Sequence, residues 1–186
     1  MWRLIAWALS RRPVARWLIA RAARTPYFDL AGYMDRAWLV PYRAVIWRRL
    51  VRRYYDEEHF ATDGTGPVSP WRRPFAWLLQ RFDLAIRVHH ILRADFARDP
   101  HDHPWNARTV ILDGWYYERR DDGLHLRERG DTATLRFEEF HNVIAVSPSG
   151  VWTLFITGRK RGRWGFRTPD GAKVPYTEYP SFKLTR

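Results

Sequence analysis

Hydrophobic and polar residues follow two different periods along this chain. From Ile86 onward, apolar and polar residues alternate, which is the pattern of a strand with one buried face. Turn-forming runs of Gly, Asp, Pro and Ser separate these segments at intervals of roughly ten residues. The eight predicted strands are residues 86–92, 105–112, 115–119, 124–128, 132–137, 140–146, 151–157 and 163–168. Short strands at this spacing predict a mainly β protein, an antiparallel sandwich or barrel.

The front of the chain shows a helical pattern instead. Between residues 2 and 55, apolar residues recur at spacings of three and four, as Ile5 and Leu9 do on one face. The residue before a proline is pushed out of the helical region, so we expect breaks before Pro26 and Pro41. The pattern predicts a helical N-terminal extension made of several short helices.

These patterns divide the chain into three parts. We expect the helical extension over residues 1–60, a linker with a short helix over 61–84, and the β domain over 85–186. The linker is predicted from the Gly, Pro, Ser and Thr content of residues 61–70. A chain of 186 residues is long enough to bury a core without disulfides.

Positive charge is concentrated in the extension. The whole chain carries a net charge of +12, but residues 1–53 hold twelve arginines against Asp29 and Asp35, a balance of +10. Such a segment attracts phosphate groups, so nucleic acid or a membrane surface is an expected partner through residues 1–53. The alternative is an ordinary solvated face.

The chain contains no cysteine, which excludes disulfides, thiolate metal sites and a cysteine nucleophile. Any bound metal must therefore be held by His, Asp or Glu. The apolar run from Leu4 to Leu9 is too short for a signal peptide or a membrane span. We expect a cytoplasmic protein.

Two histidines carry the best candidate chemistry. His101 and His103 are two residues apart, so on a strand both rings project from one face while Asp102 points the other way. This spacing allows both imidazoles to bind one ion. In the alternative interpretation, the rings bond to backbone groups or to Asp99.

A third ligand must come from another strand. His141, at the start of a predicted strand, is the first choice, and His90 is the second. Neutral imidazoles with open positions suit a divalent metal ion: Fe(II), Mn, Ni, Cu or Zn. Tyr116, Tyr117 and Glu118 are candidates for proton transfer if their strand borders the site.

Two segments resemble the conserved motifs of the cupin superfamily. Residues 101–118 resemble the first motif, with two histidines separated by one residue, a strand, and a turn at Gly114. Residues 147–158 resemble the second, with a Pro-x-Gly turn and the strand that follows it. The sequence as a whole is also similar to a group of bacterial and phage cupin-like proteins. In these proteins a basic N-terminal arm contains Gly-Tyr-Met, which is present here at residues 32–34. The resemblance implies a cupin-type antiparallel jelly-roll barrel with its site inside, and Fe(II) as the favoured metal.

The chain departs from the cupin pattern at two ligand positions. The pattern has a glutamate four or five residues after the second histidine, where this chain has Ala107 and Arg108. It has a histidine in the second motif, where this chain has Thr153. His141 as a substitute ligand is therefore a hypothesis.

Three functions follow from these observations. The first is a metal-dependent cupin enzyme, such as a non-haem iron oxygenase or dioxygenase, that modifies a small molecule. The second is a non-catalytic cupin that binds a small molecule or sugar, which the two missing ligands favour. The third is an interaction of the arginine-rich helices with nucleic acid or a membrane. Because cupins commonly pair their barrels, a homodimer is also expected.

Overall fold

The computed structural model describes residues 1–30, 32–39, 82–95 and 99–179. In these ranges the chain forms two helices followed by eleven strands. The helices are α1 (Trp2–Leu9) and α2 (Arg12–Ala22). The strands are β1 (Pro26–Leu30), β2 (Met34–Trp38), β3 (Ala85–Ile91), β4 (Trp105–Asp113), β5 (Trp115–Arg120), β6 (Gly123–Glu128), β7 (Thr132–Leu135), β8 (His141–Val146), β9 (Val151–Lys160), β10 (Gly165–Arg167) and β11 (Lys173–Pro175). The predicted mainly β fold is confirmed, and each of the eight predicted strands corresponds to one of β3 to β10.

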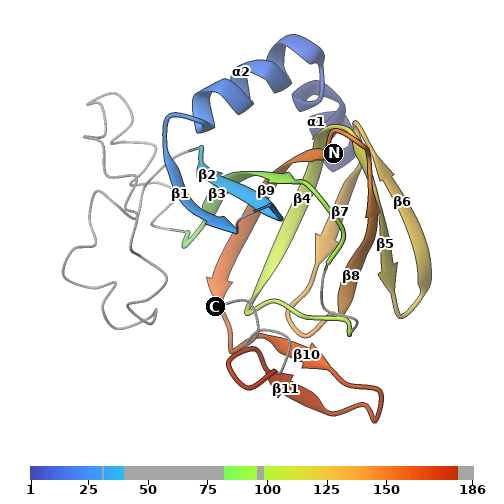
Figure 1. Ribbon diagram of the computed structural model, residues 1–186. Helices are drawn as coiled ribbons and strands as arrows, with labels where there is room; N and C mark the ends of the chain where they lie inside the picture. The colour runs from blue at the N-terminus through green and yellow to red at the C-terminus, as the bar shows by residue number, and fades with distance from the viewer. Residues whose placement is uncertain (31, 40–81, 96–98, 180–186) are drawn as a thin grey trace, which may run out of the picture.

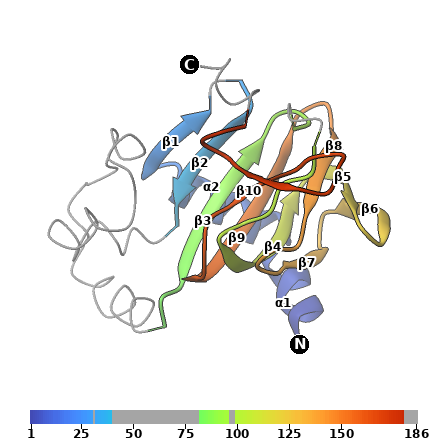
Figure 2. The ribbon, with the colours of Figure 1, turned by 90° about the horizontal axis from the view of Figure 1, so that it is seen from below.

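The strands form antiparallel sheets. Six strands make the largest sheet in the order β1-β2-β3-β9-β4-β7, three make a second sheet in the order β6-β5-β8, and β10 pairs with β11. Figure 1 shows the helices at one end of the molecule and β10 and β11 at the opposite end. Seen from below, β10 crosses in front of the six-stranded sheet, with the helices behind it (Figure 2). In the described ranges the sheets stay separate and do not close into one continuous barrel.

The helical expectation for the front of the chain is correct only as far as α2. Residues 26–30 and 34–38 form strands β1 and β2, and β2 pairs with β3 of the β domain. The turn between them contains Gly32, whose φ of +64° lies in the left-handed region that glycine tolerates best. The rest of the predicted helical extension, over residues 40–60, and the predicted linker with its short helix, over residues 61–81, lie outside the described residues. The division into three parts stays a prediction.

The two helices cover one face of the six-stranded sheet. Their small and apolar residues pack with side chains of β3, β4 and β9 that point away from the second sheet. This cluster consists of Ala6, Ala15, Leu18, Ala22, Val88, Val110, Leu112 and Leu154. In the described residues, no helix has the length and apolar character needed to cross a bilayer.

A second apolar cluster fills one end of the space between the two sheets. Ile91, Ile111 and Val151 come from the six-stranded sheet, and Tyr116 and Val143 come from β5 and β8. All five side chains are at most 8% exposed. This cluster fixes the two sheets face to face and leaves the other end of the interior to polar side chains.

The glycine turns of the two cupin-like motifs pack against each other. A Cβ on Gly114 would lie 2.6 Å from the carbonyl oxygen of Gly150, so only glycine allows this approach. Ser147 Oγ donates to the same carbonyl at 2.5 Å and accepts from the backbone N–H of Trp115 at 3.2 Å. The two turns therefore stabilise one corner of the sandwich.

Candidate metal centre

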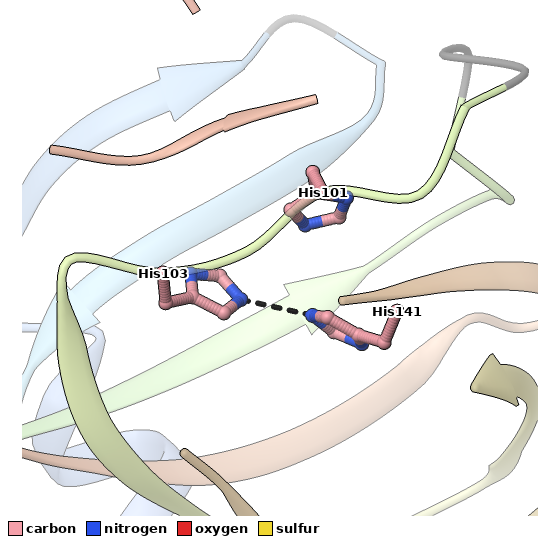
Figure 3. A group of neighbouring side chains, drawn as sticks. All are labelled: His101, His103 and His141. Atoms are coloured by element: carbon pink, nitrogen blue, oxygen red, sulfur yellow. Dashed lines mark hydrogen bonds between the residues drawn. The ribbon is translucent and has the colours of Figure 1, made fainter. Parts of the chain in front are cut away.

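The backbone brings the three predicted ligands together. His101 forms an isolated antiparallel bridge with His141, in which each N–H donates to the other's carbonyl at 2.9 Å. His103 follows two residues later on the same side. The three rings converge, as Figure 3 shows, and one nitrogen from each lies within 4.8 Å of the others. The clustering expected of His101, His103 and His141 is thus present.

His103 and His141 make the closest approach. Their Nε2 atoms are 2.9 Å apart, and the rings lie 5.1 Å apart between centroids. Two nitrogens bound to one ion at about 2.1 Å and at a right angle lie about 3 Å apart. The pair therefore has the spacing of two neighbouring ligands, and a nitrogen of His101 lies within 4.8 Å of both.

A buried carboxylate orients His141. Glu118 on β5 is fully buried, and its Oε1 lies 2.8 Å from His141 Nδ1. A carboxylate at this position favours the tautomer with the proton on Nδ1, which leaves the Nε2 lone pair free. Strand β5 thus borders the site. Glu118 therefore meets the requirement under which it was predicted as a candidate for proton transfer.

Glu118 is held as an anion by its neighbours. Its Oε2 lies 2.9 Å from Arg120 Nε and 3.3 Å from Arg127 Nε. Burial alone raises the pKa of Glu118, but hydrogen bonds and charges from His141 and Arg120 outweigh it and lower the pKa to about 2. The carboxylate is therefore ionised at neutral pH.

A second carboxylate lies beside His101. The Oδ2 atom of Asp95 is 3.8 Å from His101 Nδ1 and accepts the backbone N–H of Val143 at 2.6 Å. Asp95 Oδ1 also accepts the hydroxyl of Tyr33. Asp95 thereby connects the segment before His101 to β8 and to the turn before β2.

Both imidazoles of the first motif are held neutral. Burial lowers the pKa of His101 to about 4, although the negative charge of Asp95 opposes this. Burial also lowers the pKa of His103 well below its ordinary value, and the neighbouring His141 and His101 lower it further. Neutral rings are the form that binds metal ions.

Asp102 points away from the rings, as the alternation predicts. It is fully buried, accepts the backbone N–H of Gly165 at 2.8 Å and pairs with Lys173 Nζ at 2.5 Å. Asp99, the partner considered in the alternative interpretation, instead accepts the hydroxyl of Tyr179 at 2.6 Å. The two aspartates anchor the end of the chain around β10 and β11.

His90, the second-choice ligand, does not reach the cluster. Its ring stacks on Trp152 at 4.0 Å, with Nε2 3.0 Å from the carbonyl oxygen of Ser149 and Nδ1 3.4 Å from Asp35. Odd-numbered residues of β3 face the interior and even-numbered ones face outward, so His90 lies on the wrong side of the sheet.

Its neighbour His89 faces the interior, a position that sequence reasoning did not single out. The ring is 8% exposed and lies 4.9 Å from Phe155 between centroids. Burial and the charges of Arg36 and Arg87 lower its pKa well below the ordinary value. Among the described residues its Nε2 is buried without a hydrogen-bond partner. The period of β3 signals the inward direction of His89, but not the missing partner.

The two departures from the cupin pattern are occupied by structural residues. Ala107 packs in a small core with Leu135 and Phe155. Arg108 points to the other face and donates to the hydroxyls of Thr132 at 3.2 Å and Thr134 at 2.6 Å. Thr153 is buried. Neither of these two positions carries a metal-binding side chain. The third imidazole comes from His141 on β8 instead.

The fold and the site define a protein of two antiparallel sheets with three histidines gathered between them. No protein-family model and no curated protein matches the sequence. Similar solved structures include a cupin 2 conserved barrel domain protein from Rhodopseudomonas palustris, at 12% identity over 87% of this chain and 85% of that one, with a TM-score of 0.46. KdgF from Halomonas sp. is 11% identical over 72% of this chain and 88% of its own, with a TM-score of 0.42. A sugar phosphate isomerase of the cupin superfamily from Silicibacter pomeroyi is 14% identical over 52% and 74%, with a TM-score of 0.38. Cupin proteins are thus among the solved structures to which this chain is similar.

Proposed function

We propose that His101, His103 and His141 bind one divalent transition-metal ion and that the protein is a metal-dependent enzyme acting on a small molecule. The observation that carries the proposal is the 2.9 Å approach of His103 Nε2 to His141 Nε2 beside the buried Glu118. A hydrogen-bonded histidine pair in a core does not require a buried anion behind it. A metal ligand benefits from one, because the anion fixes the ring and makes it more basic.

The donor set suits Fe(II), Mn, Ni, Cu or Zn, and Fe(II) is the ion we propose. The three donors are imidazole nitrogens, and Glu118 adds a negative charge nearby without being one of the clustered donors. Three protein ligands leave coordination positions open, which is typical of catalytic rather than structural sites. When bound, such an ion polarises a substrate oxygen, binds dioxygen or activates water.

The surrounding residues have separate roles in this proposal. Glu118 places a negative charge 2.8 Å from His141 Nδ1, and Asp95 places another 3.8 Å from His101 Nδ1. The buried Nε2 of His89 offers a hydrogen bond to a bound molecule. The rings of Phe155 and Trp105, which contact His103, supply apolar surface that excludes water.

Metal analysis of the purified protein tests the proposal. We expect close to one equivalent of metal per chain after loading with Fe(II) under anaerobic conditions, and loss of that metal in H103A and H141A. H90A is the matched control, because it removes a histidine of β3 that lies outside the cluster. Bound metal that is unaffected by H103A and H141A, or lost equally in H90A, contradicts the assignment.

A non-catalytic ligand-binding module is the second candidate. Ala107 and Thr153 favour it, since they replace two ligands of the cupin pattern with side chains that pack in the core. The two candidates differ in their dependence on metal. A small molecule retained by metal-free H103A/H141A protein supports the binding module, whereas turnover that needs added metal supports the enzyme.

A further inference from the structure

The two N-terminal helices expose large apolar side chains to solvent. Leu4 and Trp7 on α1 are 73% and 58% exposed, and Trp17 on α2 is 60% exposed. Met1 and Val14 are exposed beside them. Single exposed apolar residues are common on proteins, but two tryptophans and a leucine on two consecutive helices concentrate exposed apolar surface in one part of the chain, which favours a binding role.

These side chains lie on helix faces that are not packed on the sheet. The opposite faces of α1 and α2, which carry Ala6, Ala15 and Leu18, are buried in the same cluster against the same sheet face. The exposed faces therefore both point away from the sheet. Figure 1 shows the two helices together at one end of the molecule, away from β10 and β11.

The same surface is strongly basic. Residues 1–28 contain six arginines and no acidic residue. Arg11 lies over the ring of Trp7, at 4.9 Å from its centroid. Among the described residues, Arg12 and Arg16 form no ion pair, so their charges are available to an external anion.

A hollow beside α2 gathers further positive charge. It has a volume of about 320 Å³ and is lined by Arg12, Arg16 and Arg129 together with Ile19 and Asp113. Asp113 lies 3.8 Å from Arg129, and Arg12 and Arg16 come from α2. A phosphate group fits the charge of Arg12 and Arg16, and the apolar lining fits the carbon chain beside a headgroup.

We propose that α1 and α2 dock the protein onto an anionic lipid surface, with Leu4, Trp7 and Trp17 inserted at the interface and Arg12 and Arg16 on headgroup phosphates. Interfacial helices combine tryptophan and leucine on one side with arginine at the flanks, as here. Duplex DNA would use only the arginines. A second copy of the chain would bring one basic surface against another, which the charges oppose.

Vesicle co-sedimentation of the full-length protein tests this docking. We expect binding to mixed phosphatidylcholine–phosphatidylglycerol vesicles and little binding to pure phosphatidylcholine vesicles. Removing both charges in R12Q/R16Q should weaken binding by about fivefold per arginine. W7S/W17S should weaken it as well and abolish the blue shift of tryptophan emission that accompanies insertion. All four side chains are exposed, so these variants should fold.

L124S is the matched control, because Leu124 on β6 is 57% exposed but lies outside the helices. The same proteins are measured against labelled duplex DNA and by sedimentation velocity without vesicles. Vesicle binding that depends on both the arginines and the tryptophans, but not on Leu124, supports the proposal. Absent vesicle binding, equal loss in L124S, tighter binding to DNA that ignores W7S/W17S, or a dimer that W7S/W17S dissociates each overturns it.

Discussion

The Nε2 atoms of His103 and His141 lie 2.9 Å apart, although 38 positions separate the two residues in the sequence. The bridge between His101 and His141 produces this approach, because it aligns the start of β8 with the segment that carries the first two histidines. At this distance the two nitrogens share either one proton or one cation. Glu118 Oε1 lies 2.8 Å from His141 Nδ1, and a carboxylate at that position supports a histidine that binds a metal ion through Nε2.

Replacing Glu118 by glutamine should weaken metal binding without removing a ligand. The substitution keeps the size of the side chain but takes away the negative charge 2.8 Å from His141 Nδ1. Loss of such a supporting carboxylate typically costs tenfold to hundredfold in affinity, so we expect a weakening of roughly that size in E118Q. Titration of the metal-free protein with Co(II), followed by absorption and calorimetry, measures the change.

Glu139 offers the control for this substitution. It shares Arg120 with Glu118, at 2.8 Å from Arg120 Nη1, and is 35% exposed on its side chain. E139Q removes a charge from the same arginine without touching His141, so its metal affinity should stay near that of the wild type. Equal affinities in E118Q and wild type would show that the carboxylate has no part in metal binding.

Glu118 should also determine part of the acid stability of the fold. Its pKa is about 2 in the folded protein, against 4.5 for an ordinary glutamate. Because the folded pKa is the lower one, the stabilisation is complete above about pH 4.5 and is lost as the pH falls toward 2. The shift corresponds to about 3 kcal/mol in the free energy of unfolding.

Urea unfolding of metal-free protein at a series of pH values measures this contribution. The wild type should lose stability between pH 4.5 and pH 2, and E118Q should show a flatter profile over the same interval. If the two profiles run parallel, the ionised carboxylate is not what stabilises the fold there.

The strands and the histidine pair were predictable because both depend on the period of two. Alternation fixes which side chains share a face, so it placed His101 and His103 together and turned Asp102 away without any tertiary information. His141 was a choice among strands, and only the pairing of residue 101 with residue 141 makes it the third member.

Other parts of the structure depend on contacts that no local pattern contains. The segment 26–38 has apolar spacing compatible with a helix, yet pairing with β3 makes it a hairpin. Glu118 was a conditional candidate, because its importance comes from the neighbouring strand that carries His141. The missing hydrogen-bond partner of His89 is likewise a property of the packed interior. Pairing between distant strands decides each of these cases.

His89 should be a residue that the fold does not need. Its Nε2 is buried without a partner among the described residues, which costs roughly 1 kcal/mol or more. H89F removes this polar atom and keeps a ring against Phe155, so the free energy of unfolding should rise by about 1 kcal/mol. Metal content should be unchanged, since His89 is not among the clustered donors.

H90F is the comparison for this variant. His90 Nε2 is hydrogen-bonded to the carbonyl oxygen of Ser149, and His90 Nδ1 lies beside Asp35. Replacing His90 should therefore lower the free energy of unfolding. Thermal and urea unfolding of both variants measures whether the free energy of unfolding rises in H89F and falls in H90F. A destabilised H89F would mean that the ring has a structural role, which would argue against its availability to a bound molecule.

Lys173 should be needed to keep Asp102 buried. Asp102 lies between His101 and His103 in the sequence and is fully buried in the structure. Lys173 Nζ lies 2.5 Å from its carboxylate and neutralises the charge. K173M leaves an unpaired buried charge, so we expect a loss of roughly 2 to 3 kcal/mol in the free energy of unfolding. The double variant D102N/K173M removes both charges and should be less destabilised than K173M alone, because asparagine still accepts the N–H of Gly165. Urea unfolding of the two variants decides the matter: a double variant that loses more stability than K173M would mean that the charge of Asp102 stabilises the fold by itself.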